Sequence, residues 1–313
     1  MKALQWQGVN KLAVGQVPDP EIRNAGDVIV KVNRTVTCGS DLHLLGGYIP
    51  FMERGDVLGP EFVGEVIEVG SDVRRHRVGD RVVVSSFIAC GRCWFCEQQL
   101  YSLCDNGNTN PAITETLWGH APGGCFGYSH AMGGNPGSHA EYVRVPFADV
   151  GAFTVPDTVT DERALFASDS ASTGWMGADL GGVKPGDVVA VWGAGAVGQM
   201  AARAAVLLGA DRVVVIDRYD NRLHQAEKHA GAEILNKALT VRGAQMHGQR
   251  YIPMLLDRMA RGELVTEYLA THVLPLDDAP IAEGLDGGDE SLRVLRDPEG
   301  NEFCLVQRGP GES

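Results

Sequence analysis

Val188-Val-Ala-Val-Trp-Gly-Ala-Gly-Ala-Val-Gly198 is the stretch that decides the fold of the second half of this chain. It opens as an apolar run of strand type, turns through glycines, and meets a helical pattern directly afterwards. Gly193 permits a tight turn, Gly195 lets a pyrophosphate approach the backbone, and Gly198 lets helix and strand pack closely. The free amide groups at the start of the helix favour an anionic phosphate. The stretch therefore predicts a strand–turn–helix unit of the dinucleotide-binding kind.

The residues after this turn complete the pattern. Apolar positions from Val197 onward keep helical spacing, and a second strand, 212–216, ends at Asp217. That acid lies about 20 residues past the last glycine, where a carboxylate can bind an adenosine ribose 2′-hydroxyl. A carboxylate would repel a 2′-phosphate, which favours NAD over NADP, although two nearby arginines weaken this preference. The alternative is a glycine-rich turn in an ordinary α/β protein. We assign the cofactor contacts to Gly193, Gly195, Val197, Gly198, Asp217, Arg218 and Arg222.

Composition excludes several classes of protein. Of the 313 residues, 44% are hydrophobic and 21% charged, which predicts a globular chain rather than a disordered one. The formal net charge of −13 argues against nucleic acid or an anionic membrane surface as the main partner. We find no apolar run long enough to span a bilayer and no signal peptide. We therefore expect a cytoplasmic protein whose seven cysteines are reduced.

The first half of the chain has a different pattern. Residues 1–155 are rich in short alternating strands and in glycine turns, which predicts a β-rich, barrel-like domain. Residues 157–180 become helical, with Asp161 as the expected N-cap, and begin a second domain at 156–262. The whole chain is thus predicted to be of the α/β class.

Four cysteines give the most specific local signal. They follow a C-x2-C-x2-C-x7-C spacing within one short loop: Cys90, Cys93, Cys96 and Cys104. Four thiolates at this spacing can close a tetrahedron around Zn²⁺ and leave no open position, which is typical of a structural site. An iron–sulfur cluster is the alternative, although no Cys-Pro follows the fourth cysteine. We predict a structural zinc.

A second group of residues lies in Cys38-Gly-Ser-Asp-Leu-His43. Cys38 is a possible ligand of a catalytic zinc, which would lower the pKa of a bound alcohol. Ser40 can hydrogen-bond a substrate hydroxyl, and His43 can pass its proton to solvent because histidine titrates near neutral pH. Alone, this hexapeptide is a weak signal. Three further histidines in a glycine-rich stretch are expected to be surface or hydrogen-bonded residues: His120, His130 and His139.

Together, these motifs resemble those of the zinc-dependent medium-chain alcohol dehydrogenases, and most of all the branch that contains glutathione-independent formaldehyde dehydrogenases. The matching phrases run almost without a break from residue 1 to 236, and the most specific are 38–50, 126–130, 140–149, 168–169 and 173–179. The resemblance implies a GroES-like catalytic domain joined to a Rossmann domain, with hydride transfer between NAD and a zinc-bound alcohol or aldehyde hydrate. It also implies that Cys38 and Asp169 are catalytic-zinc ligands and that Ser40 and His43 form a proton relay. Relatives assemble as dimers or tetramers, so a homo-oligomer is expected.

The chain departs from this pattern next to the expected zinc. The family's Gly-His-Glu phrase, whose histidine is a zinc ligand, appears here as Gly59-Pro60-Glu61. Proline has no donor atom for a metal, whereas Glu61 can offer a carboxylate oxygen. In addition, Asp169 is followed by Ser170-Ala171-Ser172, where relatives carry bulkier apolar residues and a proline.

The largest departure is in the Rossmann domain. Residues 188–236 supply one mononucleotide-binding half, whereas a complete domain needs two halves. Residues 237–246 then resemble the family's last Rossmann strand, and a C-terminal segment, 263–313, is expected to return to the catalytic domain. Within it, residues 292–307 resemble the closing hairpin of a glyoxalase-like domain, where Glu302 is a weak metal-ligand candidate.

Three functions follow from this sequence. The first is an NAD- and zinc-dependent alcohol or formaldehyde dehydrogenase, weakened by Pro60 and the shortened Rossmann domain. The second is a non-catalytic descendant that keeps the structural zinc and an adenosine site. The third, a glyoxalase-type metalloenzyme, is suggested only by the tail.

Overall fold

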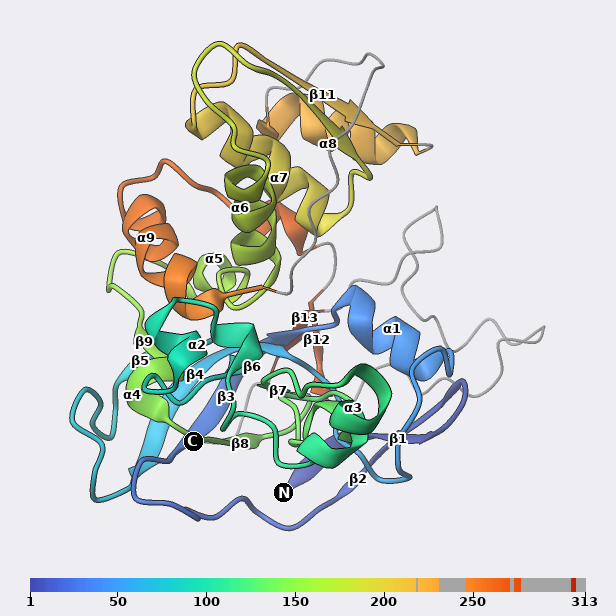
Figure 1. Ribbon diagram of the computed structural model, residues 1–313, viewed down its shortest axis with the longest axis vertical. Coiled ribbons are helices and arrows are strands. Elements are labelled where there is room, and N and C mark those ends of the chain that lie inside the picture. The colour runs from blue at the N-terminus through green and yellow to red at the C-terminus, as the bar shows by residue number, and fades with distance from the viewer. Residues whose placement is uncertain (218, 231–245, 271–272, 277–304, 308–313) are drawn as a thin grey trace.

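The computed structural model describes residues 1–217, 219–230, 246–270, 273–276 and 305–307, and Figure 1 shows its two parts. The lower part contains most of the strands, and the upper part contains helices around a small parallel sheet. The predicted α/β class, with a GroES-like unit and a Rossmann-like unit, is confirmed. The predicted domain limits remain a prediction.

The largest sheet joins the two ends of the chain. It has seven strands, which run in the order β12 (Val273–Pro275), β13 (Leu305–Gln307), β3 (Val28–Val36), β4 (Glu61–Val69), β5 (Arg81–Val84) and β9 (Ala152–Thr154), with β8 (Tyr142–Val145) also paired to β3. Among the described strands this sheet is open rather than closed, so the expected barrel-like closure is wrong. The strand β13 pairs antiparallel with β3 and parallel with β12.

Smaller elements surround this sheet. Two further antiparallel pairs are β1 (Lys2–Gly8) with β2 (Lys11–Gln16), and β6 (Phe87–Ile88) with β7 (Gly124–Cys125). The helical elements of the first half are α1 (Gly39–Leu45), α2 (Trp94–Glu97), η1 (Tyr101–Leu103), α3 (Pro111–Trp118), η2 (His130–Met132) and α4 (Ala148–Gly151). Of these, α1 carries the Cys-Gly-Ser-Asp-Leu-His motif, and α2 and η1 lie in the four-cysteine loop.

The second half begins as the glycine pattern predicts. The strand β10 (Val188–Trp192) leads through the turn into α7 (Ala196–Leu207), and β11 (Arg212–Ile216) pairs parallel with β10. The other helical elements are α5 (Asp161–Leu165), α6 (Ser170–Leu180), α8 (Asp220–Ala230), α9 (Gly248–Ala260) and η3 (Glu267–Leu269). The N-cap of α5 is Thr160, whose side chain accepts a hydrogen bond from the Arg163 amide, so the expectation of Asp161 as the cap is wrong. Thr160 is the cap because it lies one residue before the first turn of α5, where its side chain reaches a free backbone amide of that turn.

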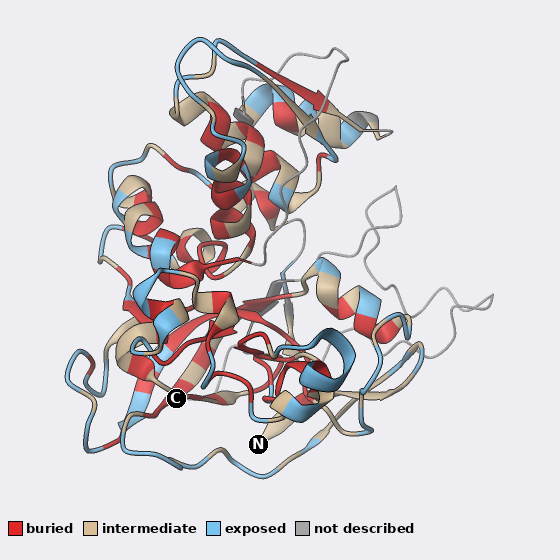
Figure 2. Ribbon diagram, viewed as in Figure 1, coloured by how far each residue is buried: buried red, intermediate tan, exposed pale blue. Residues whose placement is uncertain are grey.

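One apolar core connects the two halves. It contains Val63 and Val83 of the main sheet, Trp175 of α6, Met200 of α7 and Leu255 of α9. Figure 2 shows this buried layer continuing from the sheet into the upper helices. Helix α9 packs on α6 through its buried apolar face. Tyr251 Oη of α9 also donates a hydrogen bond to Asp179 Oδ2 of α6 at 2.7 Å. The C-terminal half of the described chain is therefore anchored to the helix that carries Asp169 and Ser170.

The parallel sheet of the upper part is narrow. Among the described residues β10 has one partner strand, β11, and the side chains of Val188 and Trp192 are 69% and 48% exposed. Parallel sheets are ordinarily covered on both faces. Within the described part of the chain, β10 is thus less covered than a parallel strand ordinarily is. Two predicted segments lie largely outside the described residues. Of the predicted last Rossmann strand, 237–246, only residue 246 is described, and of the predicted hairpin, 292–307, only 305–307 are described. Glu302 is therefore outside the described residues as well.

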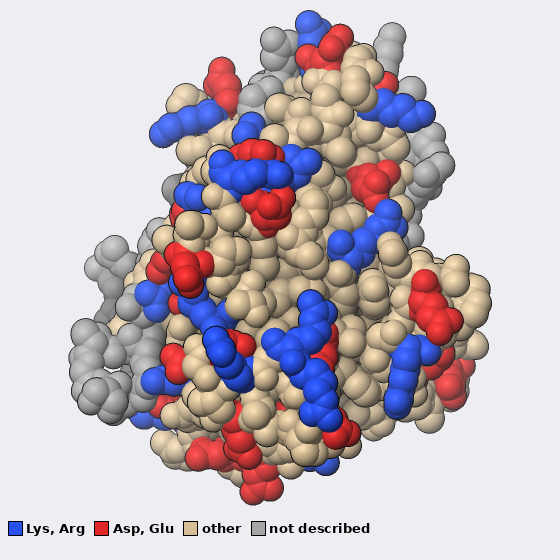
Figure 3. All heavy atoms as spheres, turned by 90° about the vertical axis from the view of Figure 1, so that its left-hand side faces the viewer, with Lys and Arg blue, Asp and Glu red and all other residues tan. Residues whose placement is uncertain are grey.

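The described helices are all too short or too polar to cross a bilayer. On the face shown in Figure 3, basic side chains lie among acidic ones, so the net negative charge is not gathered into one patch there.

Candidate active site and metal centres

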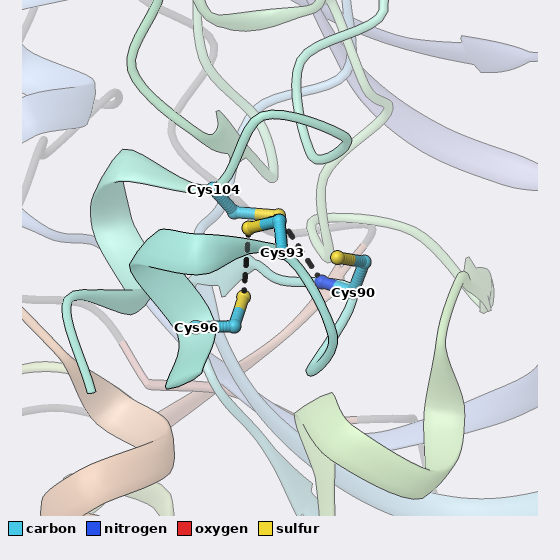
Figure 4. Close-up of side chains that lie close together, drawn as sticks. All are labelled: Cys90, Cys93, Cys96 and Cys104. Carbon is cyan, nitrogen blue, oxygen red and sulfur yellow. Dashed lines mark hydrogen bonds between the residues drawn. The ribbon is translucent and has the colours of Figure 1, made fainter. Parts of the chain in front are cut away.

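The four-cysteine loop forms a compact sulfur cluster. The Sγ atoms of Cys90, Cys93, Cys96 and Cys104 all lie within 4.8 Å of one another, and Figure 4 shows the four side chains turned towards a common centre. Cys93 Sγ lies 3.5 Å from Cys96 Sγ and 3.9 Å from Cys104 Sγ. Sulfurs bound to one zinc at about 2.3 Å in a tetrahedron are separated by similar distances. The residues therefore fit a closed, four-coordinate zinc.

Hydrogen bonds around this cluster favour thiolates. Burial acts to raise the pKa of Cys90, but hydrogen bonds from the Arg92 amide, the Asn106 side chain and the Cys93 amide outweigh it and lower the pKa to about 7. Burial raises the pKa of Cys104 to about 11, although its sulfur accepts hydrogen bonds from the Cys90 amide and the Asn106 amide. Cys90 thus ionises more readily than an ordinary thiol, whereas burial raises the pKa of Cys96 and Cys104, whose thiolates a bound cation would stabilise.

Three residues that are distant in the sequence form a second cluster. Cys38 is the N-cap of α1, Glu61 begins β4, and Asp169 is the N-cap of α6. Their ligand atoms lie within 4.8 Å of one another. One sulfur and two carboxylates are all donors that zinc accepts. The structure therefore brings together the three residues that we predicted as catalytic-metal ligands, and it does so at the meeting of the main sheet with α1 and α6.

The three donors are electrostatically unfavourable without a cation. Burial and the charge of Asp169 together raise the pKa of Glu61 to about 8. Burial also raises the pKa of Asp169, which the hydrogen bond from Thr173 Oγ1 to Asp169 Oδ1 at 2.7 Å opposes. Burial, and then the charge of Glu61, raise the pKa of Cys38 well above its usual value. A divalent cation would convert this mutual repulsion into attraction, so the donor set fits a metal.

Asp41 holds the loops that carry these donors. Its carboxylate accepts a hydrogen bond from the Cys38 amide at 2.8 Å and another from the Gly59 amide at 3.0 Å. The side chain is buried, and its position fixes the start of α1 against the Gly59-Pro60-Glu61 turn. Pro60 is buried in this turn and offers no donor, as the sequence predicts.

The predicted proton-relay residues lie on α1. A hydrogen bond from Ser40 opposes the effects that raise the pKa of the Cys38 thiol, so Ser40 reaches the metal cluster. His43 lies one helical turn further on and is exposed, with its ring edge-on to Tyr48 at 6.3 Å between centroids. The helix therefore leads from the cluster to solvent in the order that a relay requires.

Among the other histidines, the expectation is wrong for His139. Its ring is 1% exposed, and neither ring nitrogen has a hydrogen-bond partner among the described residues. It packs against Gly59. Burial raises the pKa of Asp41, and a positive charge on His139 would oppose this increase. As expected, His130 is hydrogen-bonded: Nε2 lies 3.1 Å from Asp56 Oδ1. His120 is exposed on the surface.

The glycine turn has the geometry of a phosphate-binding loop. Gly193 has a φ of +92°, which favours glycine, and Gly195 is the N-cap of α7. A Cβ added to Gly195 would meet no atom within 4 Å, so its backbone faces open space as the approach of a phosphate requires. Val197, in the first turn of α7, is 43% exposed.

Asp217 lies at the end of β11, directly beside the turn. Its Oδ2 accepts a hydrogen bond from the Ala194 amide at 2.6 Å, and its Oδ1 accepts one from the Tyr219 amide at 3.1 Å. Arg222 Nη1 is 3.7 Å from Asp217 Oδ2, while Arg218 lies outside the described residues. The carboxylate thus ties the turn to the strand end at the position where an adenosine ribose would lie.

Sequence reasoning identified the donors but missed two neighbours. Ser170 Oγ hydrogen-bonds the Glu61 carboxylate, and His139 lies beside Asp41 and Gly59. The departure at Ser170 from the family pattern was a signal for the first. Nothing in the sequence distinguishes His139 from a surface histidine.

Comparison with known proteins places these features in a family. Residues 24–157 match the alcohol dehydrogenase GroES-like domain, and residues 164–272 match the C-terminal domain of alanine dehydrogenase and PNT. A solved structure, alcohol dehydrogenase TADH from Thermus sp. ATN1, superposes with a TM-score of 0.82 and 29% identity, covering 99% of this chain and 100% of that one.

Three curated proteins are similar in sequence. An uncharacterized zinc-type alcohol dehydrogenase-like protein of Bacillus subtilis is 44% identical over 238 residues, which cover 75% of this chain and 61% of the relative. A glutathione-independent formaldehyde dehydrogenase of the same species is 38% identical, over 75% of this chain and 59% of the relative. A medium chain reductase/dehydrogenase of Acremonium sp. is 35% identical, over 73% of each chain. The chain thus spans about three fifths of the length of the two Bacillus relatives.

Proposed function

This chain belongs to the zinc-type alcohol dehydrogenase family, and on that premise we propose that it transfers a hydride between NAD and a small alcohol or aldehyde hydrate. The observation that carries the proposal is the convergence of Cys38, Glu61 and Asp169 within 4.8 Å, although Pro60 has replaced a ligand. The similarity to a formaldehyde dehydrogenase supports formaldehyde hydrate or another small substrate.

In this proposal Cys38, Glu61 and Asp169 hold a zinc ion, which when bound acts as a Lewis acid and lowers the pKa of a substrate hydroxyl. Ser40 accepts the hydroxyl proton at its Oγ and passes its own proton towards His43, which releases it to solvent. The hydride acceptor would be the nicotinamide ring of NAD when that cofactor is bound. The turn at Gly193 to Gly198 and the carboxylate of Asp217 bind the pyrophosphate and the ribose. We also assign Val197, Arg218 and Arg222 to the adenosine side of NAD, and Arg218 lies outside the described residues.

The zinc of the four-cysteine cluster has a structural role in this proposal. The four-cysteine cluster offers no open coordination position, so a zinc there would stabilise the loop without contacting substrate. An iron–sulfur cluster would be coloured, and the absorption spectrum of the purified protein therefore separates the two. Reduced cysteines favour the cytoplasm as the compartment, and the proposed assembly is a homo-oligomer.

A non-catalytic descendant is the second candidate. It is favoured by the buried Pro60 and by β10, which has one partner strand among the described residues. The dehydrogenase reading predicts growth of the NADH absorbance with formaldehyde or small alcohols. The second candidate predicts no NADH, and equal affinity for ADP-ribose and NAD in calorimetry. Turnover by the metal-loaded chain decides between them, and a Ser40→Ala variant without turnover is the control for contaminating enzymes.

A further inference from the structure

The two departures from the family pattern beside the metal cluster meet in space. Ser170 Oγ lies 3.0 Å from Glu61 Oε1 and 2.9 Å from Glu61 Oε2, and the Ser170 amide lies 3.2 Å from Oε2. Both side chains are buried: Ser170 is 5% exposed and Glu61 is 1% exposed. One residue therefore contacts both oxygens of the carboxylate that would replace the missing imidazole.

The position of Ser170 suits it to orient a ligand. It is the first residue of α6, and it directly follows Asp169, so a single helix start supplies one metal ligand and the group that contacts another. A carboxylate has about four lone-pair positions. The Ser170 hydroxyl has one proton to donate and its amide another, so together they fill two of these positions and leave two for a cation. An apolar side chain at this position could not donate such a bond.

We propose that Ser170 is a positioning residue that fixes Glu61 as a permanent metal ligand, in place of the histidine that Pro60 removes. This inference rests on the proposed catalytic metal site. Hydrogen bonds to a ligating carboxylate fix its rotamer before the metal binds, so metal binding loses less side-chain conformational entropy. The chain has thus changed two positions that act together, and the second change preserves the site that the first one weakens.

The test measures metal rather than turnover. Zinc per chain is counted by native mass spectrometry on the full protein, and the affinity of each zinc is measured by competition with a chromogenic chelator. The zinc of the four-cysteine cluster serves as the internal reference. The variants are Ser170→Ala, which removes the hydroxyl, and Ser170→Thr, which keeps it. Ser172→Ala is the matched control, because Ser172 is buried on the same helix and its hydroxyl donates a hydrogen bond to the Ala167 carbonyl, at 2.6 Å.

The second zinc is the one that Cys38, Glu61 and Asp169 would hold. We expect Ser170→Ala to lower the affinity for this zinc by about 10- to 100-fold, as loss of a hydrogen-bond partner of a metal ligand typically does. Ser170→Thr and Ser172→Ala should bind it as the natural chain does. In a Pro60→His background the Ser170→Ala effect should shrink, because the imidazole then supplies a ligand that does not depend on Ser170. A merely structural role of Ser170 would not produce that dependence on residue 60.

Each result decides the inference. If Ser170→Ala holds the second zinc as tightly as Ser172→Ala does, Ser170 does not position Glu61, while the proposed metal site stands. If Ser170→Ala and Ser172→Ala lose zinc and thermal stability to the same extent, the effect is one of folding and the inference is wrong. If the natural chain binds zinc only in the four-cysteine cluster, the inference and the proposed function fail together.

Discussion

The Gly193 carbonyl oxygen lies so close to Gly198 that a Cβ added to Gly198 would be 1.8 Å from it. This contact joins the strand end to the first turn of α7, and it leaves no room for any side chain. Close packing therefore requires a glycine at position 198. At Gly195 a side chain would instead occupy the open space that a phosphate would fill.

Gly198→Ala should consequently disrupt the turn. The new methyl group must push the backbone of Gly193 away, which should cost about 1–3 kcal/mol of stability. It should also weaken ADP-ribose binding by about tenfold or more, equivalent to roughly 1.4 kcal/mol. Calorimetric titration with ADP-ribose and thermal melting measure the two effects. Gly177→Ala is the control, because an added Cβ there meets no atom within 4 Å. Unchanged ADP-ribose binding in Gly198→Ala would argue against a nucleotide at this turn.

Removal of one sulfur should empty the four-cysteine cluster. Cys104→Ser leaves three thiols for the metal, and we expect the loss of one zinc per chain together with a lower melting temperature. Elemental analysis and thermal melting give both values. Cys125→Ser is the matched control, because Cys125 is a buried thiol outside the cluster. If Cys104→Ser keeps its zinc, or if both variants lose stability equally, the cluster has no metal role.

The sequence predicted the parts of the fold whose determinants are local. The four cysteines are close in the chain, and the glycine turn is flanked by its own strand and helix, so spacing alone indicated both. Cys38, Glu61 and Asp169 are different, because they come from α1, β4 and α6. Only the family resemblance indicated that they meet.

Contacts made through the tertiary fold were out of reach. The sequence showed Ser170 only as a departure from the family pattern. Its hydroxyl contacts Glu61, which begins a strand far away in the sequence. His139 was expected to be a surface or hydrogen-bonded residue, but its ring is buried against the turn at Gly59 and its nitrogens have no hydrogen-bond partner among the described residues. The open sheet also followed from pairing that no strand pattern specifies, since β13 joins β3.

Stability should depend on pH through His247. Ser102 N lies 3.4 Å and Ser102 Oγ 3.0 Å from His247 Nδ1, and an atom that accepts a backbone N–H cannot carry a proton. Burial, and then the charge of Arg250, lower the pKa of His247 below its usual 6.5. The unfolded chain therefore takes up a proton first as the pH falls through 6.5, and the folded state loses stability. His247→Asn keeps an acceptor that does not titrate, so its melting temperature should fall less over this range. Parallel melting curves for both proteins would contradict the assignment.

Pro60→His should strengthen the second metal site. An imidazole at this position would add a nitrogen ligand beside Glu61, and the nearby Asp41 carboxylate, which already accepts a hydrogen bond from Gly59, could orient the ring. We expect the affinity for the second zinc to rise by about tenfold or more, which is the lower end of the change that follows when a hydrogen-bond partner of a metal ligand is removed. Native mass spectrometry under chelator competition measures the change.

The same variant tests whether the natural chain is active. If the natural chain turns over, Pro60→His should raise the rate of NADH formation and leave ADP-ribose binding unchanged, because Asp217 and the glycine turn belong to a different part of the fold. Pro60→Ala is the control, since it removes the proline ring without adding a donor. Turnover that appears only in Pro60→His, with a second zinc that also appears only there, would show that the natural chain has lost its chemistry and would support the non-catalytic descendant. Equal zinc binding in Pro60→His and Pro60→Ala would instead mean that residue 60 does not face the metal, and that Cys38, Glu61 and Asp169 alone define the site.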